Sequence, residues 1–432
     1  MADVISNFYP SHHVDPGEPG LVAAYTFSAN ELAQFGRYLN RARSGAIYDL
    51  TTSVGTPIIG QGGGVYVHDA VGSYWQGTSY SGGSRIRALV NVTSAPAGTR
   101  AIFQNGNRYL IYLSSANEPY ISLDGGVTYT GWLTNISNRG PVLIDGWLTE
   151  GLMQRLYANG TYCNQSGPVT AGATAGYMQC GRHSEIRMAA VYDPASARIT
   201  DAQIRASYVR DFARHIVWQW TPRDVGEGPA GGILTGSHSG VGGWTCPLGA
   251  STMSFVWRAD LSIPSGGRLC LTDTQTTTLN RIDFEYGSRP WFGSYLIEYQ
   301  VRNPASDNLV VGWLPIRGAD PTAAGSASYW VHVRPTGGVY RSSVYYANST
   351  EIVGVDMTTP AAGDRCAVLV TRHPSGDIRV YSLGRNGWTA CSAAVNHVTS
   401  LSEGCMTVAP RGAYVERVTM FQGEMMPEEL RS

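Results

Sequence analysis

The chain has 432 residues, a formal net charge of −1, and 15% charged against 43% hydrophobic residues. That balance excludes an intrinsically disordered chain, and the lack of any basic run excludes the charge pattern of a nucleic-acid-binding protein. The length favours two domains if the fold is all-β, because single β-sandwiches often take about 200 residues.

Residues 1–20 are polar and rich in proline, and they predict an extended N-terminal arm. Such an arm either frays or docks as a strap on a neighbouring subunit. The first residues lack the charged start and apolar core of a signal peptide, and no later run approaches the roughly 20 apolar residues that span a bilayer. We therefore expect a protein made and assembled in a cytoplasm, without a membrane partner.

Short strands dominate the next segment. Runs of about four to eight apolar or alternating residues are separated by Gly, Asn, Asp or Ser, and this pattern predicts a β-sandwich. The clearest runs are 21–27, 86–92, 109–113 and 120–123.

One helix interrupts the strands. Thr200 fits an N-cap, and apolar residues recur at helical spacing from Ala202 to Ile216. The Pro- and Gly-rich stretch 218–232 follows and predicts a linker. We therefore expect a first domain at 21–217 and a second at 233–432.

The two halves of the chain repeat one another. A strand pair at 142–160 precedes Cys163 and Cys180, and a similar pair at 367–387 precedes Cys391 and Cys405. A further strand and a short helical phrase follow each second cysteine. Earlier in each half, 85–92 matches 254–260. A repeat of about 200 residues indicates two copies of one domain, not a solenoid.

Three segments of the first copy resemble a known family. Gln154 to Gly160, Met188 to Tyr192 and Ile199 to Ile204 look like the C-terminal half of concanavalin A-like or laminin-G-like jelly rolls. The second copy departs from the pattern, because 383–387 replaces the short Asn-Gly turn and the chain end shortens the helix. The resemblance implies two tandem antiparallel β-sandwich (jelly-roll) domains, as found in accessory proteins of tailed-bacteriophage virions. It says little about function, because this fold hosts many activities.

No catalytic, metal or cofactor site is predicted. Glycoside hydrolases of this fold use paired carboxylates, and the nearest candidates are Asp283 and Glu285, which would share one strand face. Arg281 stands where a first glutamate would be needed, so a solvated strand face is the favoured interpretation. The nine histidines and seven cysteines show no ligand spacing, and cytoplasmic synthesis favours reduced thiols.

Aromatic side chains are the best binding candidates. Their faces can stack on sugars while their polar tips tolerate water, although packing in the core or an interface is the favoured explanation for such residues. The candidates for carbohydrate binding are Tyr74, Trp75, Tyr80, Trp291, Tyr295, Trp313 and Trp330.

Three functions fit these features. The first is a non-enzymatic structural or adhesive component of a phage or phage-like particle, such as a head-decoration, spike, collar or tail-associated protein. It would be oligomeric in the assembly, attach to other virion proteins through the arm and contact host polysaccharide. The alternatives are a stand-alone carbohydrate-binding lectin and a glycoside hydrolase acting through Asp283 and Glu285.

Overall fold

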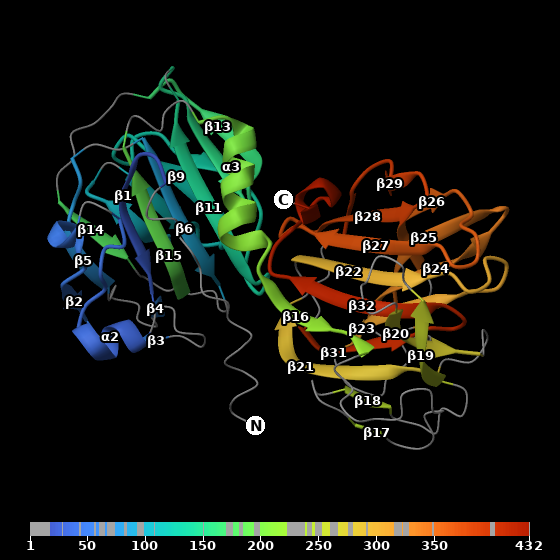
Figure 1. Cartoon of the computed structure of the whole chain (residues 1–432). Helices are drawn as coiled ribbons and strands as arrows, with labels where there is room; N and C mark the ends of the chain where they lie inside the picture. Colours follow the sequence, from blue (N-terminus) through green and yellow to red (C-terminus); the bar gives the residue numbers. More distant parts are fainter. Residues whose placement is uncertain are drawn as a thin grey trace. The chain divides into compact units, whose positions relative to one another are not determined.

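The computed structural model of the chain divides into two compact units, residues 1–215 and 216–432, here called the first and second domains. Both are built almost wholly from antiparallel strands, as predicted, and each contains two sheets (Figure 1). The structure describes residues 18–27, 29–42, 45–55, 58–59, 65–66, 74–81, 84–92, 99–107, 109–149, 151–169, 176–180, 185–193, 199–222, 238–239, 244–246, 253–259, 267–274, 280–290, 293–314, 322, 328–347, 350–397 and 402–431. No helix within these ranges is long and apolar enough to cross a membrane.

The first domain is a sandwich of two sheets. One sheet has the order β13-β12-β11-β6-β15-β4-β3, with β1 also pairing with β15, and the other has the order β10-β9-β8-β7-β14-β5-β2. The strands of the first sheet are β1 (Leu21–Thr26), β3 (Ile58–Ile59), β4 (Val65–Tyr66), β6 (Arg85–Asn91), β11 (Pro141–Leu148), β12 (Gln154–Ala158), β13 (Thr161–Ser166) and β15 (Glu185–Tyr192). Those of the second are β2 (Thr52–Val54), β5 (Tyr74–Thr78), β7 (Arg100–Asn105), β8 (Tyr109–Leu113), β9 (Pro119–Ser122), β10 (Thr130–Gly131) and β14 (Tyr177–Cys180).

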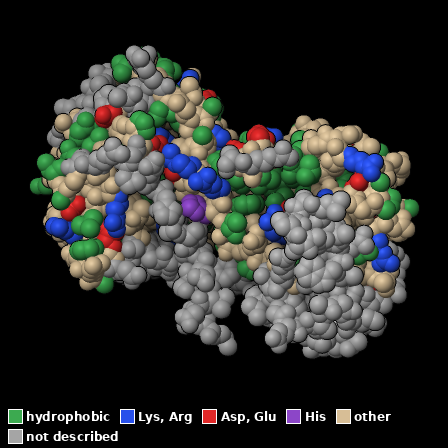
Figure 2. Space-filling view, viewed as in Figure 1, with side chains coloured by type: hydrophobic (Ala, Val, Ile, Leu, Met, Phe, Trp, Pro, Cys, Tyr) green, Lys and Arg blue, Asp and Glu red, His purple; other side chains and the backbone are tan. Residues whose placement is uncertain are grey.

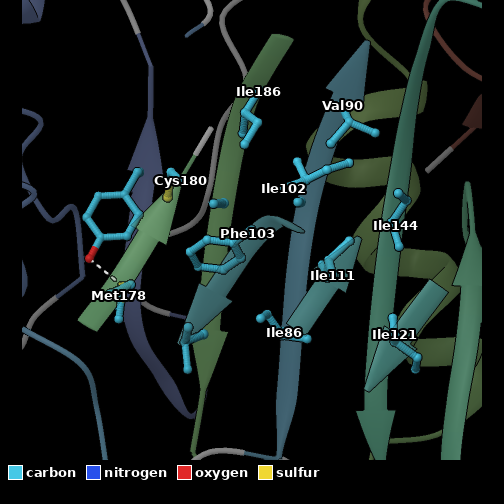
Figure 3. Packing of buried hydrophobic residues seen from close by; sticks show 14 of the residues in the cluster. Ile86, Val90, Ile102, Phe103, Ile111, Ile121, Ile144, Met178, Cys180 and Ile186 are labelled. Carbon is cyan, nitrogen blue, oxygen red and sulfur yellow. Dashed lines mark hydrogen bonds between the residues drawn. The ribbon is translucent and has the colours of Figure 1, made fainter. Parts of the chain in front are cut away.

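The core of the first domain lies between its two sheets, as Figure 3 shows. Every second residue of a strand points to the same face, so alternate apolar residues of both sheets meet there. Burying each of these large side chains contributes about 1.5–3 kcal/mol. The shared members include Ile86, Val90 and Ile144 from one sheet and Phe103, Ile111 and Ile121 from the other.

Local chemistry fixes the helix and hairpin that the sequence predicted. Thr200 is the N-cap of α3 (Asp201–Tyr208) and forms a capping box with Gln203. Asn159 and Gly160 both have positive φ and join β12 to β13, as a type I′ turn requires. A Cβ atom at Gly160 would lie only 2.8 Å from the Cβ of Tyr208, so the helix packs closely over this turn.

The helical region differs from the prediction in two ways. α3 ends at Tyr208 and continues as a π-helical turn, η3 (Val209–Ala213), so Ile216 does not belong to it. A further helix, α2 (Ala29–Phe35), was not predicted. A short 3₁₀ turn, η1 (Ala46–Tyr48), completes the helical elements described in this domain.

A buried network of ion pairs holds η3 against the first sheet. Arg85 donates to both carboxylate oxygens of Asp145 at 2.6 and 2.7 Å. Arg87 lies 3.0 Å from Asp145 and 2.8 Å from Asp211 of η3. All four side chains are at most 2% exposed. A buried charge without a partner costs several kcal/mol of stability, so the two carboxylates are required to compensate the buried arginines.

Glu18 joins this network from the N-terminal side. Its carboxylate accepts hydrogen bonds from Tyr192 at 3.0 Å, Ser207 at 3.3 Å and Arg210 at 3.0 Å. The sequence assigned residues 1–20 to the arm, but Glu18 is fixed on the first domain. The remainder of the predicted arm, 1–17, lies outside the described residues.

The second domain is also a sandwich. One sheet has the order β19-β20-β32-β22-β27-β28-β29, with β16 on β32 and β30 on β28, and the other has the order β17-β18-β21-β31-β23-β24-β25-β26. The strands of the first sheet are β16 (Ile216–Trp220), β19 (Met253–Ala259), β20 (Gly267–Asp273), β22 (Gly293–Gln300), β27 (Arg365–Arg372), β28 (Asp377–Gly384), β29 (Gly387–Ala390), β30 (Val395–Asn396) and β32 (Tyr414–Phe421). Those of the second are β17 (His238–Ser239), β18 (Trp244–Cys246), β21 (Ile282–Pro290), β23 (Leu309–Leu314), β24 (Tyr329–Thr336), β25 (Val339–Tyr346), β26 (Thr350–Met357) and β31 (Ser402–Ala409), and a 3₁₀ helix, η5 (Pro427–Arg431), follows.

The strand orders of the two domains coincide. The run β13-β12-β11-β6-β15 with β1 corresponds to β29-β28-β27-β22-β32 with β16, and β10-β9-β8-β7-β14-β5 corresponds to β26-β25-β24-β23-β31-β21. The chain therefore contains the same sandwich twice.

Topology corrects two details of the sequence repeat. The counterpart of β6 is β22, so the match of 85–92 with 254–260 was wrong; the latter covers β19, at a sheet edge. Cys180 faces the core of its domain, whereas Cys405 lies on the opposite, outer face of β31, since it alternates with Met406, which pairs with the inward Trp313.

The domain boundary is also earlier than predicted. β16 pairs with β32, so residues 216–220 belong to the second domain, although the sequence divided them between the first domain and the linker. Most of the predicted linker, 223–232, lies outside the described residues. The six described cysteines form no disulfide with one another.

Candidate functional site

The described side chains on the outer face of the β10–β2 sheet of the first domain are uncharged. Because Trp75, Phe103, Ile111 and Met178 point into the core, the residues that alternate with them point outward. Ile102 is the exception, since a register shift between Ala101 and Phe103 places it in the core as well. The register confirms that the outward residues lie opposite one another on adjacent strands. Those with described side chains are Thr52, Val54, Tyr74, Gln76, Thr78, Ala101, Gln104, Leu110, Tyr112, Tyr120, Ser122, Tyr177 and Gln179.

Three tyrosines form a cluster on this face, here called the tyrosine cluster: Tyr112, Tyr120 and Tyr129. Tyr112 and Tyr120 are direct cross-strand partners, and their rings stack with centroids 5.5 Å apart and planes 18° apart. Tyr129 meets Tyr112 edge-on at 4.9 Å. The first two are half-buried and Tyr129 is 48% exposed. The cluster is thus fixed in place but open to solvent.

A glycine on the neighbouring strand makes room for the cluster. Gly131 of β10 pairs with Tyr120, and a Cβ atom there would lie 2.1 Å from the Tyr120 ring. The ring therefore rests directly on the backbone of β10, and any side chain at this position would displace it.

The loop that carries Tyr129 is held by a buried carboxylate. Asp124 accepts hydrogen bonds from the backbone N–H groups of Val127 at 3.2 Å and Thr128 at 3.0 Å, and from the Ser122 hydroxyl at 2.9 Å. Burial alone would raise the pKa of Asp124, but the hydrogen bonds from Thr128, Ser122 and Val127 hold it below its usual value. Gln154, also buried, donates to the Thr128 carbonyl at 3.0 Å. Tyr129 is therefore positioned before any ligand arrives.

Three glutamines lie in register beside the tyrosine cluster, and we call them the glutamine row. Gln179 of β14 is the cross-strand partner of both Gln76 of β5 and Gln104 of β7. All three side chains are half-buried, and none has a hydrogen-bond partner within the described part of the chain. Each amide offers donors and an acceptor, so the row can satisfy groups that both donate and accept.

One acidic side chain, Glu118, lies beside the hydroxyl of Tyr120. The Tyr120 hydroxyl is 3.5 Å from the Glu118 carboxylate, which also accepts from Ser114 at 3.2 Å. Burial, followed by the Glu118 carboxylate, raises the pKa of Tyr120, and burial, followed by Tyr129 and Tyr120, raises that of Tyr112. Both phenols are neutral donors at physiological pH. On the surface shown in Figure 2, the described acidic and basic side chains are interspersed without a large patch of one sign.

Only part of the predicted aromatic set lies near this face. Tyr74 is half-buried on its outer side, whereas Trp75 points into the core against Tyr38, with centroids 5.3 Å apart. Tyr80 is half-buried and meets Tyr48 edge-on at 5.9 Å. Tyr74 therefore remains a glycan-contact candidate, and Trp75 is a core residue.

The predicted residues of the second domain are buried. Tyr295 and Trp313 are fully buried and pack together between the sheets at 4.7 Å. Trp330 is 4% exposed and stacks on Tyr345, which is 5% exposed, at 4.3 Å. These three predicted rings are closed to a glycan, because stacking needs an open ring face. Trp291 lies outside the described residues.

The tyrosine cluster was not predicted, although the strands that carry it were. Tyr112 and Tyr120 stand within the predicted strands 109–113 and 120–123 and alternate with the core residues Ile111 and Ile121. That alternation was the available signal, but it was incomplete, because the aliphatic Leu110 lies on the same outer face as Tyr112.

The acidic pair considered for hydrolysis does not form an open site. Asp283 is fully buried on β21, and its carboxylate lies 3.4 Å from Arg281. The side chain of Glu285 lies outside the described residues. Across the described residues, no three His, Cys, Asp or Glu side chains gather closely enough to hold a metal ion.

Comparison with known proteins leaves the family open. No protein-family model matches the chain, and no curated protein sequence matches it. Among solved structures, the receptor binding domain of botulinum neurotoxin D is 8% identical with a TM-score of 0.37, covering 94% of this chain and 99% of that one. The binding domain of Paraclostridial Mosquitocidal Protein 1 is 9% identical with a TM-score of 0.36, covering 93% and 91%. The binding domain of botulinum neurotoxin DC in complex with SialylT is 7% identical with a TM-score of 0.34, covering 93% and 94%. Similarity at this level carries no conclusion about fold or function.

Proposed function

We propose that the chain is a non-enzymatic carbohydrate-binding protein and that the tyrosine cluster and glutamine row of the first domain form its binding site. The observation that carries this proposal is the combination of open tyrosine rings and three amides, on a sheet face whose described side chains are uncharged and leave these amides without a partner. Aromatic faces suit the apolar faces of sugars, and amides suit their hydroxyl groups.

The proposed binding site is also preorganised. Gly131 seats Tyr120, and Asp124 holds the loop that carries Tyr129. Binding then costs little ordering of side chains, and tyrosine in particular loses little conformational entropy because it has few rotatable bonds. A surface of this composition also suits a protein partner, so the test has to separate the two.

A glycan array followed by calorimetric titration of the full chain tests the proposal. We expect Tyr120→Ala to weaken glycan binding about tenfold, equivalent to about 1.4 kcal/mol. Tyr162→Ala is the matched control, because Tyr162 is 45% exposed and packs on another tyrosine, but lies on β13 of the other sheet. Failure of the full chain to bind any glycan, or equal binding by Tyr120→Ala, would contradict the proposal.

We propose further that the protein serves as an accessory component of a phage or phage-like particle, attached to other virion proteins through residues preceding Glu18. Support comes from the tandem sandwiches and from the anchoring of Glu18, which gives an arm a fixed base on the first domain. A chain lacking residues 1–17 keeps Glu18 and should fold and bind glycan normally, yet fail to co-purify with particles. Normal attachment of this truncated chain would favour a stand-alone lectin or another attachment surface.

A further inference from the structure

We infer that the binding site takes an uncharged, extended glycan that lies across the strands from the tyrosine cluster to the glutamine row, and that it rejects acidic glycans. This inference rests on the proposed function and specifies the ligand class of the same site. It follows from the register of the outward residues and from the charges around them.

The glutamine row gives the direction of the ligand. Gln76, Gln179 and Gln104 are consecutive cross-strand neighbours on β5, β14 and β7. Adjacent strands lie about 4.8 Å apart, so the row spans about 10 Å at right angles to the strands. Leu110 of β8 continues the row, as the partner of Gln104.

The tyrosine cluster lies at one end of this row. Tyr112 is two residues beyond Leu110 on the same strand face, which places it about 7 Å along β8. A compact single sugar would cover either the rings or the amides, whereas an extended chain contacts both. The ligand class that uses the whole face is therefore an oligosaccharide of several units.

Charge decides between neutral and acidic chains. None of the described outward side chains of this sheet is basic, so an acidic sugar would lose hydration without gaining an ionic partner. Glu118, beside Tyr120, adds repulsion at the rim. Hydroxyl groups of a neutral sugar can instead donate to and accept from the three glutamine amides, which lack partners in the described part of the protein.

The test titrates the full chain with neutral chains (dextran, laminarin and galactan oligosaccharides) and acidic chains (alginate and polysialic acid oligosaccharides). We expect binding to at least one neutral probe and none to the acidic probes. Gln104→Ala and Gln179→Ala should each weaken neutral binding about fivefold, the loss of roughly one hydrogen bond. Gln165→Ala is the matched control, an exposed glutamine on β13 of the other sheet. Thermal unfolding checks that every variant is folded.

The possible outcomes distinguish failure of the inferred ligand class from failure of the proposed carbohydrate-binding function. Acidic chains that bind as tightly as neutral ones, with loss of binding in Tyr120→Ala, would overturn the inference and leave carbohydrate binding intact. Neutral binding that is unchanged in both glutamine variants would overturn the extended path. No binding of any glycan by the folded wild-type chain would overturn the function and the inference together.

Discussion

The two domains each carry a stacked aromatic pair on corresponding strands, but the two pairs differ in exposure. Tyr112 and Tyr120 are cross-strand partners on β8 and β9, and Trp330 and Tyr345 are cross-strand partners on the equivalent strands β24 and β25. The first pair is half-buried on an open face, while the second is 4% and 5% exposed. A duplicated sandwich can thus leave an aromatic pair open to solvent in one copy and bury the pair on the corresponding strands in the other.

The surroundings of the two pairs explain the difference. The tyrosine cluster is flanked by uncharged amides, whereas Trp330 clusters with Val310, Ala409 and Tyr345. Near Tyr345, Arg341 forms ion pairs with Glu351 at 2.5 Å and with Asp356 at 2.6 Å. The outer face around Trp330 and Tyr345 is therefore occupied by contacts within the second domain, and we expect it to contribute to stability without binding glycans.

The largest effect should come from removing the buried ring. Trp330→Ala should destabilise the second domain by about 3–5 kcal/mol, because it leaves a large cavity, while glycan binding by the first domain is unchanged. Tyr120→Ala should cost only about 1 kcal/mol of stability, because its ring is half-buried. Urea unfolding of the full chain measures both. Equal destabilisation by the two variants would contradict the contrast between the faces.

The β13–β3 sheet of the first domain and the β19–β29 sheet of the second give another contrast. The first holds a buried group of ion pairs and the second a partly exposed pair. Asp145→Ala leaves Arg85 and Arg87 buried without their shared carboxylate and should cost about 3–5 kcal/mol. Glu298 of β22 pairs with Arg417 of β32, the counterparts of β6 and β15, and these side chains are 18% and 38% exposed. Glu298→Ala should therefore cost under about 1 kcal/mol. Hydrogen exchange of the backbone amides in β6 and β22 measures the stability of each domain separately. If Glu298→Ala destabilised its domain as much as Asp145→Ala does, the proposed difference between buried and exposed ion pairs would be wrong.

Acid should act on the second domain through His332. Burial, followed by Arg334 and Arg411, lowers the pKa of His332 to about 3, against 6.5 for an ordinary histidine, and the ring contacts Asn308. Between pH 6.5 and 3 the unfolded state binds a proton that the folded state does not. Stability is therefore complete above pH 6.5 and falls by about 1.4 kcal/mol per pH unit below it. The difference in slope between wild type and His332→Gln, from urea titrations at several pH values, isolates this contribution. Parallel slopes would show that His332 does not carry it.

Sequence reasoning succeeded where the controlling chemistry is local. The cap at Thr200 and the turn at Asn159 and Gly160 depend on a few adjacent residues, and the all-β class follows from strand-length patterns. It failed for the match of 85–92 with 254–260, because strand order is set by pairing between residues far apart in the chain. β22, the true counterpart of β6, shares none of its arginines.

The site was harder to predict than the fold, because residue type does not reveal which way a strand faces. Trp313 looked like a binding aromatic but points between the sheets, while its neighbour Gly312 is on the outer side. A shift of one residue exchanges the two faces of a strand. Tyr112 and Tyr120 were distinguishable only once Ile111 and Ile121 were known to be in the core.

Radical footprinting of the full chain with a saturating neutral oligosaccharide tests the central claim most directly. If the outer face of the first domain is the binding site, modification of Tyr112, Tyr120 and Tyr129 should drop several-fold on binding, while Tyr162 and the rings of the second domain keep their free-state labelling. Unchanged labelling of these three tyrosines in the saturated complex would contradict the account.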